Sequence, residues 1–402
     1  MVALFSGKPQ QVVLLQPLFG YQPLLTALRH QVRLYPAGNV NFAPGACERL
    51  EPYLSSKIVG QELALKQISD AVCDHLQQLE PARPLVLSLH GPPGVGKSMF
   101  HLLAAQSLYN RRVLPGLQCP GRDCQGYKVL YGMDYIAEER QVQHNLIRAA
   151  LLEHVRQAPE SLLVVEEYDK LDCQMRGFFR QLLENGRIAN VTLNRAIIVM
   201  ESNIGYTELH ELLVAAGDRR KISAEEAQRV LKDMVFDKWL AQGCEERTDT
   251  LKMVGPMNVE AAAVGGAAGV GLVDFFLPFF PLERSHIRKL FAMRLAERSE
   301  QLEADRLLGL VWDEGVIDFL TDKVDFEGAY PIEGAKEVAT IMTRYVSRPV
   351  RDWAAQQKQQ TQQAKQASVD RQRQQQERIA QPPRGRLRVA GGGASLVIKP
   401  SR

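Results

Sequence analysis

The chain is constrained most by a glycine-rich octapeptide, GPPGVGKS, that lies between an apolar run and an amphipathic stretch. It matches the phosphate-binding pattern GxxxxGK[ST], which is informative when a strand precedes it and a helix follows. Residues 85–89 are apolar enough for a buried strand, and SMFHLLAAQSLY, which begins at Ser98, has a helical pattern. The glycines let backbone N–H groups turn toward a phosphate, and the helix N-terminus adds a favourable dipole. This context predicts an α/β nucleotide-binding domain.

The loop is predicted to bind ATP and Mg²⁺ as cofactors. Lys97 would reach the β- and γ-phosphates, and Ser98 would ligate the metal ion. The predicted nucleotide-binding residues are Gly91, Pro92, Pro93, Gly94, Val95, Gly96, Lys97 and Ser98.

A second short strand is predicted where Leu162 to Val165 run directly into Glu166 and Glu167. In P-loop ATPases one acid helps to hold Mg²⁺, and a second can polarise the attacking water. We assign the first role to Glu166, together with Ser98, and the second, catalytic role to Glu167. The alternative is a pair of strand-end acids that only face solvent. The usual first acid is aspartate, so the longer Glu166 is expected to displace the water shell of the metal ion.

Another apolar run, AIIVMES, ends at Ser202 and is followed by Asn203. An amide at the tip of a neighbouring strand could orient water beside the γ-phosphate. An asparagine after a strand is also a common turn residue, and the two interpretations are compatible. Asn203 is therefore a candidate catalytic residue.

Short apolar runs alternate with amphipathic stretches through the first half of the chain. This alternation predicts an α/β fold in which helices flank a parallel sheet. The predicted strands are 84–91, 127–132, 162–165 and 196–202, and the longest predicted helices begin at Gln61 and Glu139. The Gly/Ala-rich residues 251–271 are predicted to form a loop.

The chain is predicted to have four parts. They are an N-terminal extension (1–48), a large nucleotide-binding domain (49–280), a small helical domain (281–353) and a Gln-rich, basic, disordered tail (354–402).

Charge is distributed unevenly over the 402 residues, which carry a formal net charge of +3. The tail has ten Lys or Arg and two acids, so it carries +8 and leaves −5 on the rest. An acidic body predicts no nucleic-acid surface, and the basic tail is either solvated or in contact with RNA, an acidic partner or an anionic membrane.

No apolar run is long enough for a membrane span. The N-terminus is a poor signal peptide, and a truncated start is the alternative.

Six cysteines permit fifteen pairings, so the sequence leaves the connectivity open. Cys119 and Cys124 could close a small loop or bind a metal ion. A zinc site is not favoured, because the chain has no second pair of Cys or His residues at the spacing that zinc ligands have. Free or buried thiols and one local disulfide both remain open.

The order of P-loop, acidic strand, Asn-tipped strand and helical C-terminal domain resembles the AAA+ ATPases, and within them the torsins, which are related to the Clp disaggregases. The resemblance covers roughly residues 57–350 and is carried by IVGQELALKQISDAV, PLVLSLHGPPGVGKS, EEYDK, ESNIG, VDFFLPFFPLERSHIRKL and YPIEGAKEV. It implies that Lys336 contacts the nucleotide phosphates from the small domain, as the lysine of the sensor 2 motif. Torsins usually have Gly-Cys-Lys where this chain has Gly334-Ala335-Lys336, so redox regulation through that cysteine is not expected. Torsins commonly have asparagine directly after the P-loop lysine, where this chain has Ser98.

Arginines are missing where a self-activating Clp ring places its arginine finger. The sequence has no arginine between Arg247 and Arg284. Torsins also lack a finger of their own, and membrane-anchored activators supply one. The resemblance therefore implies a weak ATPase that is activated in trans and that can form homo-oligomers. An arginine introduced at Val270 or Gly271 is expected to restore some self-activation.

The resemblance also implies a function at the endoplasmic reticulum lumen or nuclear envelope, in remodelling proteins or membranes. Asn190-Val191-Thr192 is a glycosylation sequon. One rival is a Clp-like remodeller that obtains its finger from Arg187 or Arg195. Its pore loop would need Tyr135-Ile136, which are more typical of a helix start. Another rival is a nucleotide-gated scaffold without useful turnover.

Overall fold

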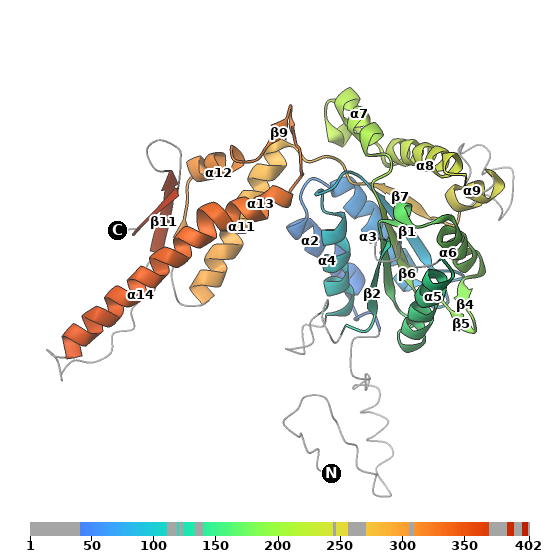
Figure 1. Ribbon diagram of the computed structural model, residues 1–402, viewed down its shortest axis with the longest axis horizontal. Helices are drawn as coiled ribbons and strands as arrows, with labels where there is room; N and C mark the ends of the chain where they lie inside the picture. The colour runs from blue at the N-terminus through green and yellow to red at the C-terminus, as the bar shows by residue number, and fades with distance from the viewer. Residues whose placement is uncertain are drawn as a thin grey trace, which may run out of the picture.

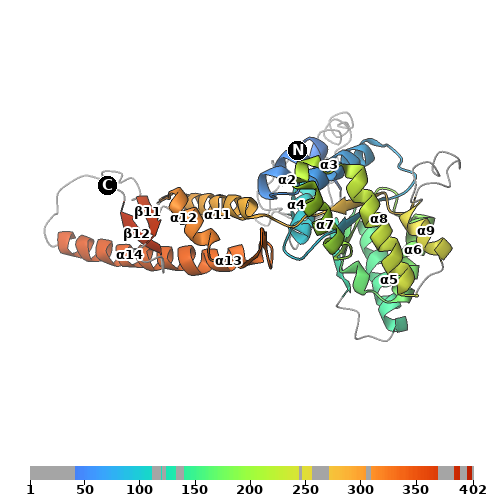
Figure 2. The same cartoon turned by 90° about the horizontal axis from the view of Figure 1, so that it is seen from above.

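The computed structural model describes residues 41–110, 119, 124–132, 140–243, 247–255, 271–304, 309–369, 384–389 and 396–400. These residues form an α/β body and an arm of helices that extends to one side of it (Figure 1). The view from above shows the same separation, with the end of helix α14 far from the body (Figure 2).

A five-stranded sheet with the order β2-β3-β6-β1-β7 forms the centre of the body. Its strands are β1 (Leu85–His90), β2 (Tyr127–Tyr131), β3 (Leu162–Glu166), β6 (Ile197–Ser202) and β7 (Phe275–Pro278). All four pairings are parallel. Every residue of β1 and β6 is buried, which explains their continuous apolar sequences, because a parallel sheet is covered on both faces. The predicted α/β fold with a parallel sheet is confirmed.

Helices cover both faces of this sheet. They are α2 (Ala46–Lys57), α3 (Glu62–Gln77), α4 (Lys97–Tyr109), α5 (Arg140–Gln157), α6 (Cys173–Asn185), α7 (Tyr206–Ala216), α8 (Ala224–Ala241) and α9 (Arg247–Val254). Successive strand residues point to opposite faces. Leu87 therefore belongs to the core beneath α2, α3 and α4, whereas Val86 belongs to the core beneath α5, α6 and α8.

The edge strand β7 was not predicted as a strand. Proline discourages a strand assignment because it cannot donate to the ladder. Pro278 is the last residue of an edge strand, where this loss is tolerated. Asp274 fixes the start of the strand, since its carboxylate accepts a hydrogen bond from the backbone N–H of Val86 at 2.8 Å and pairs with Arg83.

The arm contains α11 (Arg284–Ala304), β8 (Gly309–Val311), α12 (Glu314–Thr321), α13 (Lys336–Met342), a π-helical turn (Thr343–Ser347) and α14 (Arg348–Val369). A short hairpin, β9 (Phe326–Glu327) and β10 (Tyr330–Pro331), joins α12 to α13. Buried residues of the arm, such as Phe291 and Leu320, are continuous with the core beneath α2 to α4. The proposed domain boundaries remain predictions.

The tail differs from the predicted disorder in three segments. Helix α14 continues to Val369, and β11 (Arg384–Val389) and β12 (Leu396–Pro400) form a sheet with β8. The segments LRV and LVI supply the β-branched and apolar residues that favour strands.

Four short elements complete the body: η2 (Tyr168–Lys170), β4 (Arg187–Ile188), β5 (Val191–Thr192) and η3 (Arg219–Lys221). Of the predicted loop at 251–271, α9 includes 251–254, and 256–270 lie outside the described residues. Among the residues that are described, no helix combines the length and the apolar character needed to cross a membrane.

Candidate nucleotide-binding site

The P-loop turns from β1 into α4 through a backbone that requires glycine. Gly94 and Gly96 have φ angles of 77° and 109°, in a region that L-residues with side chains rarely adopt. A Cβ at Gly94 would also lie 2.2 Å from the carbonyl oxygen of Glu333. The loop therefore needs glycine for its turn and for the close approach of the arm.

Lys97 is the first residue of α4 and lies inside the loop. Its Nζ donates hydrogen bonds to the carbonyls of Gly91 (2.6 Å) and Pro92 (2.9 Å) and to Oδ1 of Asn203 (3.0 Å). Burial lowers the pKa of Lys97 to about 8, against the negative charges of Glu201 and Asp169. The ammonium group is thus held at the centre of the loop, where terminal phosphates would be neutralised. The predicted catalytic Asn203 contacts this lysine, and its role in orienting water stays a prediction.

A cavity of about 460 Å³ brings most of the predicted residues together. The predicted residues that line it are Pro93, Gly94, Val95, Gly96, Lys97, Ser98, Glu166, Glu167, Asn203 and Lys336. Gly91 and Pro92 do not line it and contribute their carbonyls to Lys97 instead. The order of the strands explains this convergence, because the carboxyl ends of parallel strands meet at one edge of a sheet, where ligands bind in open α/β folds.

The two predicted acids occupy different conformations at this edge. Glu166 ends β3, whereas Glu167 has a left-handed backbone with φ 53°. A non-glycine residue in this region costs on the order of 1–3 kcal/mol and is found preferentially at functional sites. This change of backbone conformation between two consecutive acids fits different roles for them.

The arm contacts the P-loop through the residues before Lys336. The N–H of Ala335 donates to the carbonyl of Gly94 at 2.8 Å. Gly334 has φ 60°, and a Cβ there would lie 2.7 Å from the same carbonyl oxygen. This packing brings Lys336 to the cavity, as the resemblance implied.

Sequence reasoning missed three side chains that surround Glu166. Nε2 of His101 lies 2.8 Å from Oε1 of Glu166, and Nδ1 of His101 lies 2.6 Å from the hydroxyl of Tyr127. Glu201 accepts a hydrogen bond from Ser98 Oγ at 3.1 Å. The sequence carried two signals for these side chains. One is a glutamate, Glu201, inside the apolar run AIIVMES, and the other is a histidine, His101, three positions after Ser98 on the same helix.

Glu201 is buried at the carboxyl end of β6. Burial raises its pKa to about 6, with His101 opposing the shift and Glu166 adding to it. Its Oε1 is buried and makes no hydrogen bond. This orphaned oxygen lies beside the predicted metal ligands Ser98 and Glu166, so the residues fit a cation, and their hydroxyl and carboxylate oxygens are the type that Mg²⁺ prefers.

The two arginines considered as internal fingers differ in their surroundings. Arg195 is paired with Glu160 and also donates to the carbonyl of Leu79 at 2.9 Å. Arg187 is exposed on β4. Tyr135-Ile136, considered for a pore loop, lie outside the described residues.

The cysteines form disulfides, which decides the alternative that the sequence left open. Cys47 bonds to Cys73 and joins α2 to α3, and Cys119 bonds to Cys124. Cys173 is also disulfide-bonded. Among the described cysteines none is a free thiol, and at Cys119 and Cys124 the structure has a disulfide in place of free thiols or metal ligands.

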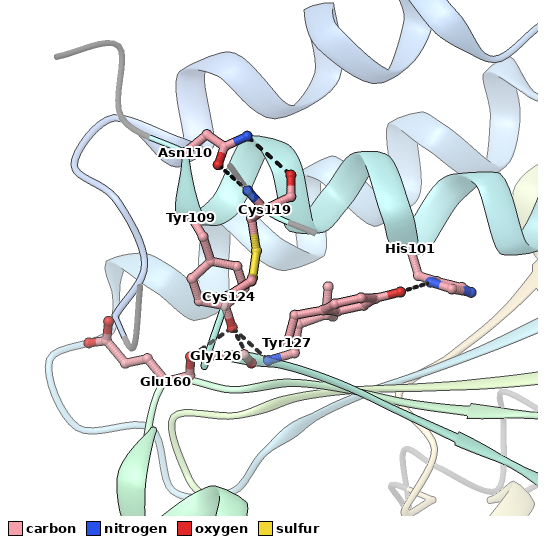
Figure 3. Close-up of a disulfide and its surroundings, with 9 residues drawn as sticks. His101, Tyr109, Asn110, Cys119, Cys124, Gly126, Tyr127 and Glu160 are labelled. Atoms are coloured by element: carbon pink, nitrogen blue, oxygen red, sulfur yellow. Dashed lines mark hydrogen bonds between the residues drawn. A yellow bond between two sulfur atoms is a disulfide. The ribbon is translucent and has the colours of Figure 1, made fainter. Parts of the chain in front are cut away.

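The Cys119–Cys124 disulfide lies against the end of α4 (Figure 3). Asn110 accepts from the N–H of Cys119 at 2.6 Å and donates to its carbonyl at 3.2 Å. The hydroxyl of Tyr109 donates toward the carbonyls of Gly126 and Glu160 at 2.7 and 2.8 Å. These contacts fix the start of β2 against the helix that carries Lys97 and His101.

The fold and the cavity define a P-loop protein of the AAA+ class, and similarity to known proteins narrows the class. The Torsin family model matches residues 39–118. A torsin-like protein of Caenorhabditis elegans is 23% identical over 295 residues, which cover 72% of this chain and 74% of that protein. The chloroplastic chaperone protein ClpB2 of rice (Oryza sativa subsp. japonica) is 26% identical over 308 residues, and the chaperone protein ClpB of Chlamydia pneumoniae is 24% identical over 315 residues.

Each ClpB match covers 74% of this chain but only 28% and 31% of the two chaperones, so the chain spans less than a third of their length. Together with the site, the matches support a relationship to the torsins and to the Clp chaperones of the AAA+ class.

Proposed function

We propose that this protein binds ATP with Mg²⁺, hydrolyses it slowly by itself, and is activated by a separate protein that supplies an arginine. The observation that carries the proposal is the cavity in which the P-loop, both strand-end acids, Asn203 and Lys336 meet. The ATP hydrolysis would drive the remodelling of proteins or membranes.

Each residue has a role that follows from its position. Lys97 neutralises the terminal phosphates from inside the loop, and Lys336 adds charge from the arm. Ser98 and Glu166 would hold Mg²⁺, which neutralises the phosphate oxygens when it is bound. Glu167 polarises water as the general base, and Asn203 orients that water or holds Lys97. Since Lys336 belongs to the arm, movement of the arm would couple nucleotide state to shape.

The missing charge explains the need for an activator. Phosphoryl transfer develops charge that an arginine from a neighbouring protein can stabilise, an effect of about 10³- to 10⁵-fold in GTPases. The sequence between Arg247 and Arg284 offers no arginine. Gly271 cannot accept one, because a Cβ there would lie 2.7 Å from the backbone of Val254 and Gly255. Val270, the other position considered, lies outside the described residues.

The Clp-like rival needs an arginine from within a homo-oligomer. Arg195 is already bound to Glu160, which favours Arg187 as the residue that this rival would use. The scaffold rival needs no finger and predicts no gain from an activator. Measurements of ATP turnover distinguish the Clp-like and the scaffold hypotheses from the proposal.

The disulfides support an oxidising compartment, and with the resemblance they support the endoplasmic reticulum lumen or nuclear envelope. Disulfides persist in such compartments and are rare in the cytosol. Asn190 of the sequon is exposed in the turn between β4 and β5, where an oligosaccharide can be attached. A mobility shift of the cellular protein on deglycosylation, lost in Asn190→Gln, would test this location.

Turnover with candidate activators tests the function. The full chain is assayed at saturating ATP and Mg²⁺ with the luminal domain of a membrane-anchored candidate that has an exposed arginine. We expect a large gain that disappears when this arginine is changed to alanine. Equal turnover with and without every candidate would contradict activation in trans.

A further inference from the structure

Three side chains from three different elements converge beside the P-loop. His101 comes from α4, Glu166 from the end of β3, and Glu201 from β6. One potential ligand atom of each lies within 4.8 Å of the others. A nitrogen and two carboxylate oxygens at these separations are near enough for one metal ion to bind all three.

The buried carboxylate of Glu201 points to a cation. Its Oε2 accepts from Ser98, but Oε1 is buried without a hydrogen bond. His101 Nε2 lies 3.5 Å from this oxygen and donates instead to Glu166. A buried polar atom without a partner costs about 1–3 kcal/mol, and more if it is charged. An ion between the three side chains would remove this cost.

Tyr127 holds the histidine in the orientation that a metal ligand needs. Nδ1 of His101 lies 2.6 Å from the Tyr127 hydroxyl, so Nε2 points away from the tyrosine (Figure 3). Nε2 lies 2.8 Å from Oε1 of Glu166. Metal-ligating histidines almost always use their other ring nitrogen in such a bond. A hydroxyl can donate or accept. Tyr127 can therefore donate to Nδ1 while Nε2 carries the proton, and accept from Nδ1–H once exchange with solvent has moved that proton to Nδ1 and left Nε2 free for a metal ion.

We propose that His101, Glu166 and Glu201 bind one divalent first-row transition-metal ion in the absence of nucleotide. Mg²⁺ binds through one or two carboxylates together with phosphates and waters, and it seldom occupies a site made of protein ligands alone. Imidazole favours transition metals, and their affinities exceed that of Mg²⁺ at mixed nitrogen and oxygen sites. The inference deepens the proposed function, because Glu166 borders both this site and the predicted ATP–Mg²⁺ site.

Binding of Mn²⁺ to the full-length, nucleotide-free protein tests the site. Free Mn²⁺ is followed by its electron paramagnetic resonance signal during titration, in the presence of excess Mg²⁺. We expect one Mn²⁺ per chain, at least tenfold weaker binding for H101N and E201Q, and roughly tenfold weaker binding for Y127F, which removes only the orienting hydroxyl. His210→Asn, on α7 and packed against Tyr330, is the matched control and should bind normally.

Pulsed electron paramagnetic resonance of Mn²⁺ bound to the unaltered protein makes the test independent of how the variants fold. A nitrogen coupling from His101 is expected, and its absence would overturn the proposal. Equal Mn²⁺ affinity in H101N would also overturn it, as would displacement of Mn²⁺ by equimolar Mg²⁺. ATP affinity is measured separately with a fluorescent analogue and Mg²⁺, so failure to bind ATP would refute the proposed function while leaving the Mn²⁺ result to decide this inference.

Discussion

The two walls of the nucleotide cavity differ in how completely their polar groups are satisfied. In the P-loop wall, which includes Lys97 and Asn203, the ammonium group has three acceptors: Oδ1 of Asn203 and the carbonyls of Gly91 and Pro92 beside the cavity. The carboxylate wall, formed by Glu166, Glu167 and Glu201, includes a strained backbone and an orphaned oxygen, and His101 contacts it through Glu166. The polar groups around Lys97 are thus paired with one another, whereas the carboxylate wall keeps one buried oxygen that a bound cation would satisfy.

The carboxylate wall should show the largest effect when its catalytic base is neutralised. Glu167→Gln keeps the size and hydrogen bonding of the side chain but removes the charge that polarises water. We expect activated turnover to fall by about 10²- to 10⁴-fold, the usual range for general-base catalysis, while ATP stays bound. Turnover and retained nucleotide are measured on the same sample.

Glu166→Gln is the companion variant and should raise the Mg²⁺ concentration needed for turnover without trapping ATP. If Glu166→Gln traps ATP and Glu167→Gln is harmless, the roles of the two acids are reversed.

The P-loop wall should lose nucleotide affinity when its charge is removed. Lys97→Ala deletes a charge-assisted contact to the terminal phosphates, worth about 1.5–3 kcal/mol, so ATP affinity should fall by roughly 10- to 100-fold. Equilibrium titration with a fluorescent ATP analogue measures this loss. Lys66→Ala, at an exposed lysine of α3 paired with Asp70, is the control, and unchanged affinity in a folded Lys97→Ala protein would refute the P-loop assignment.

A smaller effect should come from separating the arm from the P-loop wall. Gly334 and Gly328 both have φ 60°, but only a Cβ at Gly334 would meet the carbonyls of Gly94 and Pro93. Alanine at either position should cost about 1–2 kcal/mol of stability for the left-handed backbone. ATP affinity should weaken in Gly334→Ala alone, and equal affinities in the two variants would show that this contact does not support the site.

The sequence predicted best which residues come together where each of them occurs in a short segment with its own pattern. The P-loop, Glu166 and Glu167 at the end of β3, and Asn203 occur in such segments, and the parallel strand order brings them to one edge. His101 and Glu201 were missed because their meaning depends on contacts between α4, β3 and β6, which no single segment encodes. The strand β7 was missed because Pro278 disfavours a strand except at an edge, and edge position is a property of the assembled sheet.

The disulfides could not be assigned for the same reason. Cys47 and Cys73 are 26 residues apart and meet only because α2 packs against α3. The strands of the tail depend on β8, about 75 residues earlier in the chain.

Turnover of the purified protein across a series of its own concentrations tests the central claim, that the γ-phosphoryl charge is compensated only by an arginine from another protein. The assay uses saturating ATP and Mg²⁺, with Glu167→Gln as the blank. We predict slow turnover per chain that stays constant as the protein concentration rises. Rapid hydrolysis that increases steeply with concentration, and that is lost in Arg187→Ala, would contradict the account and show a finger supplied within a homo-oligomer.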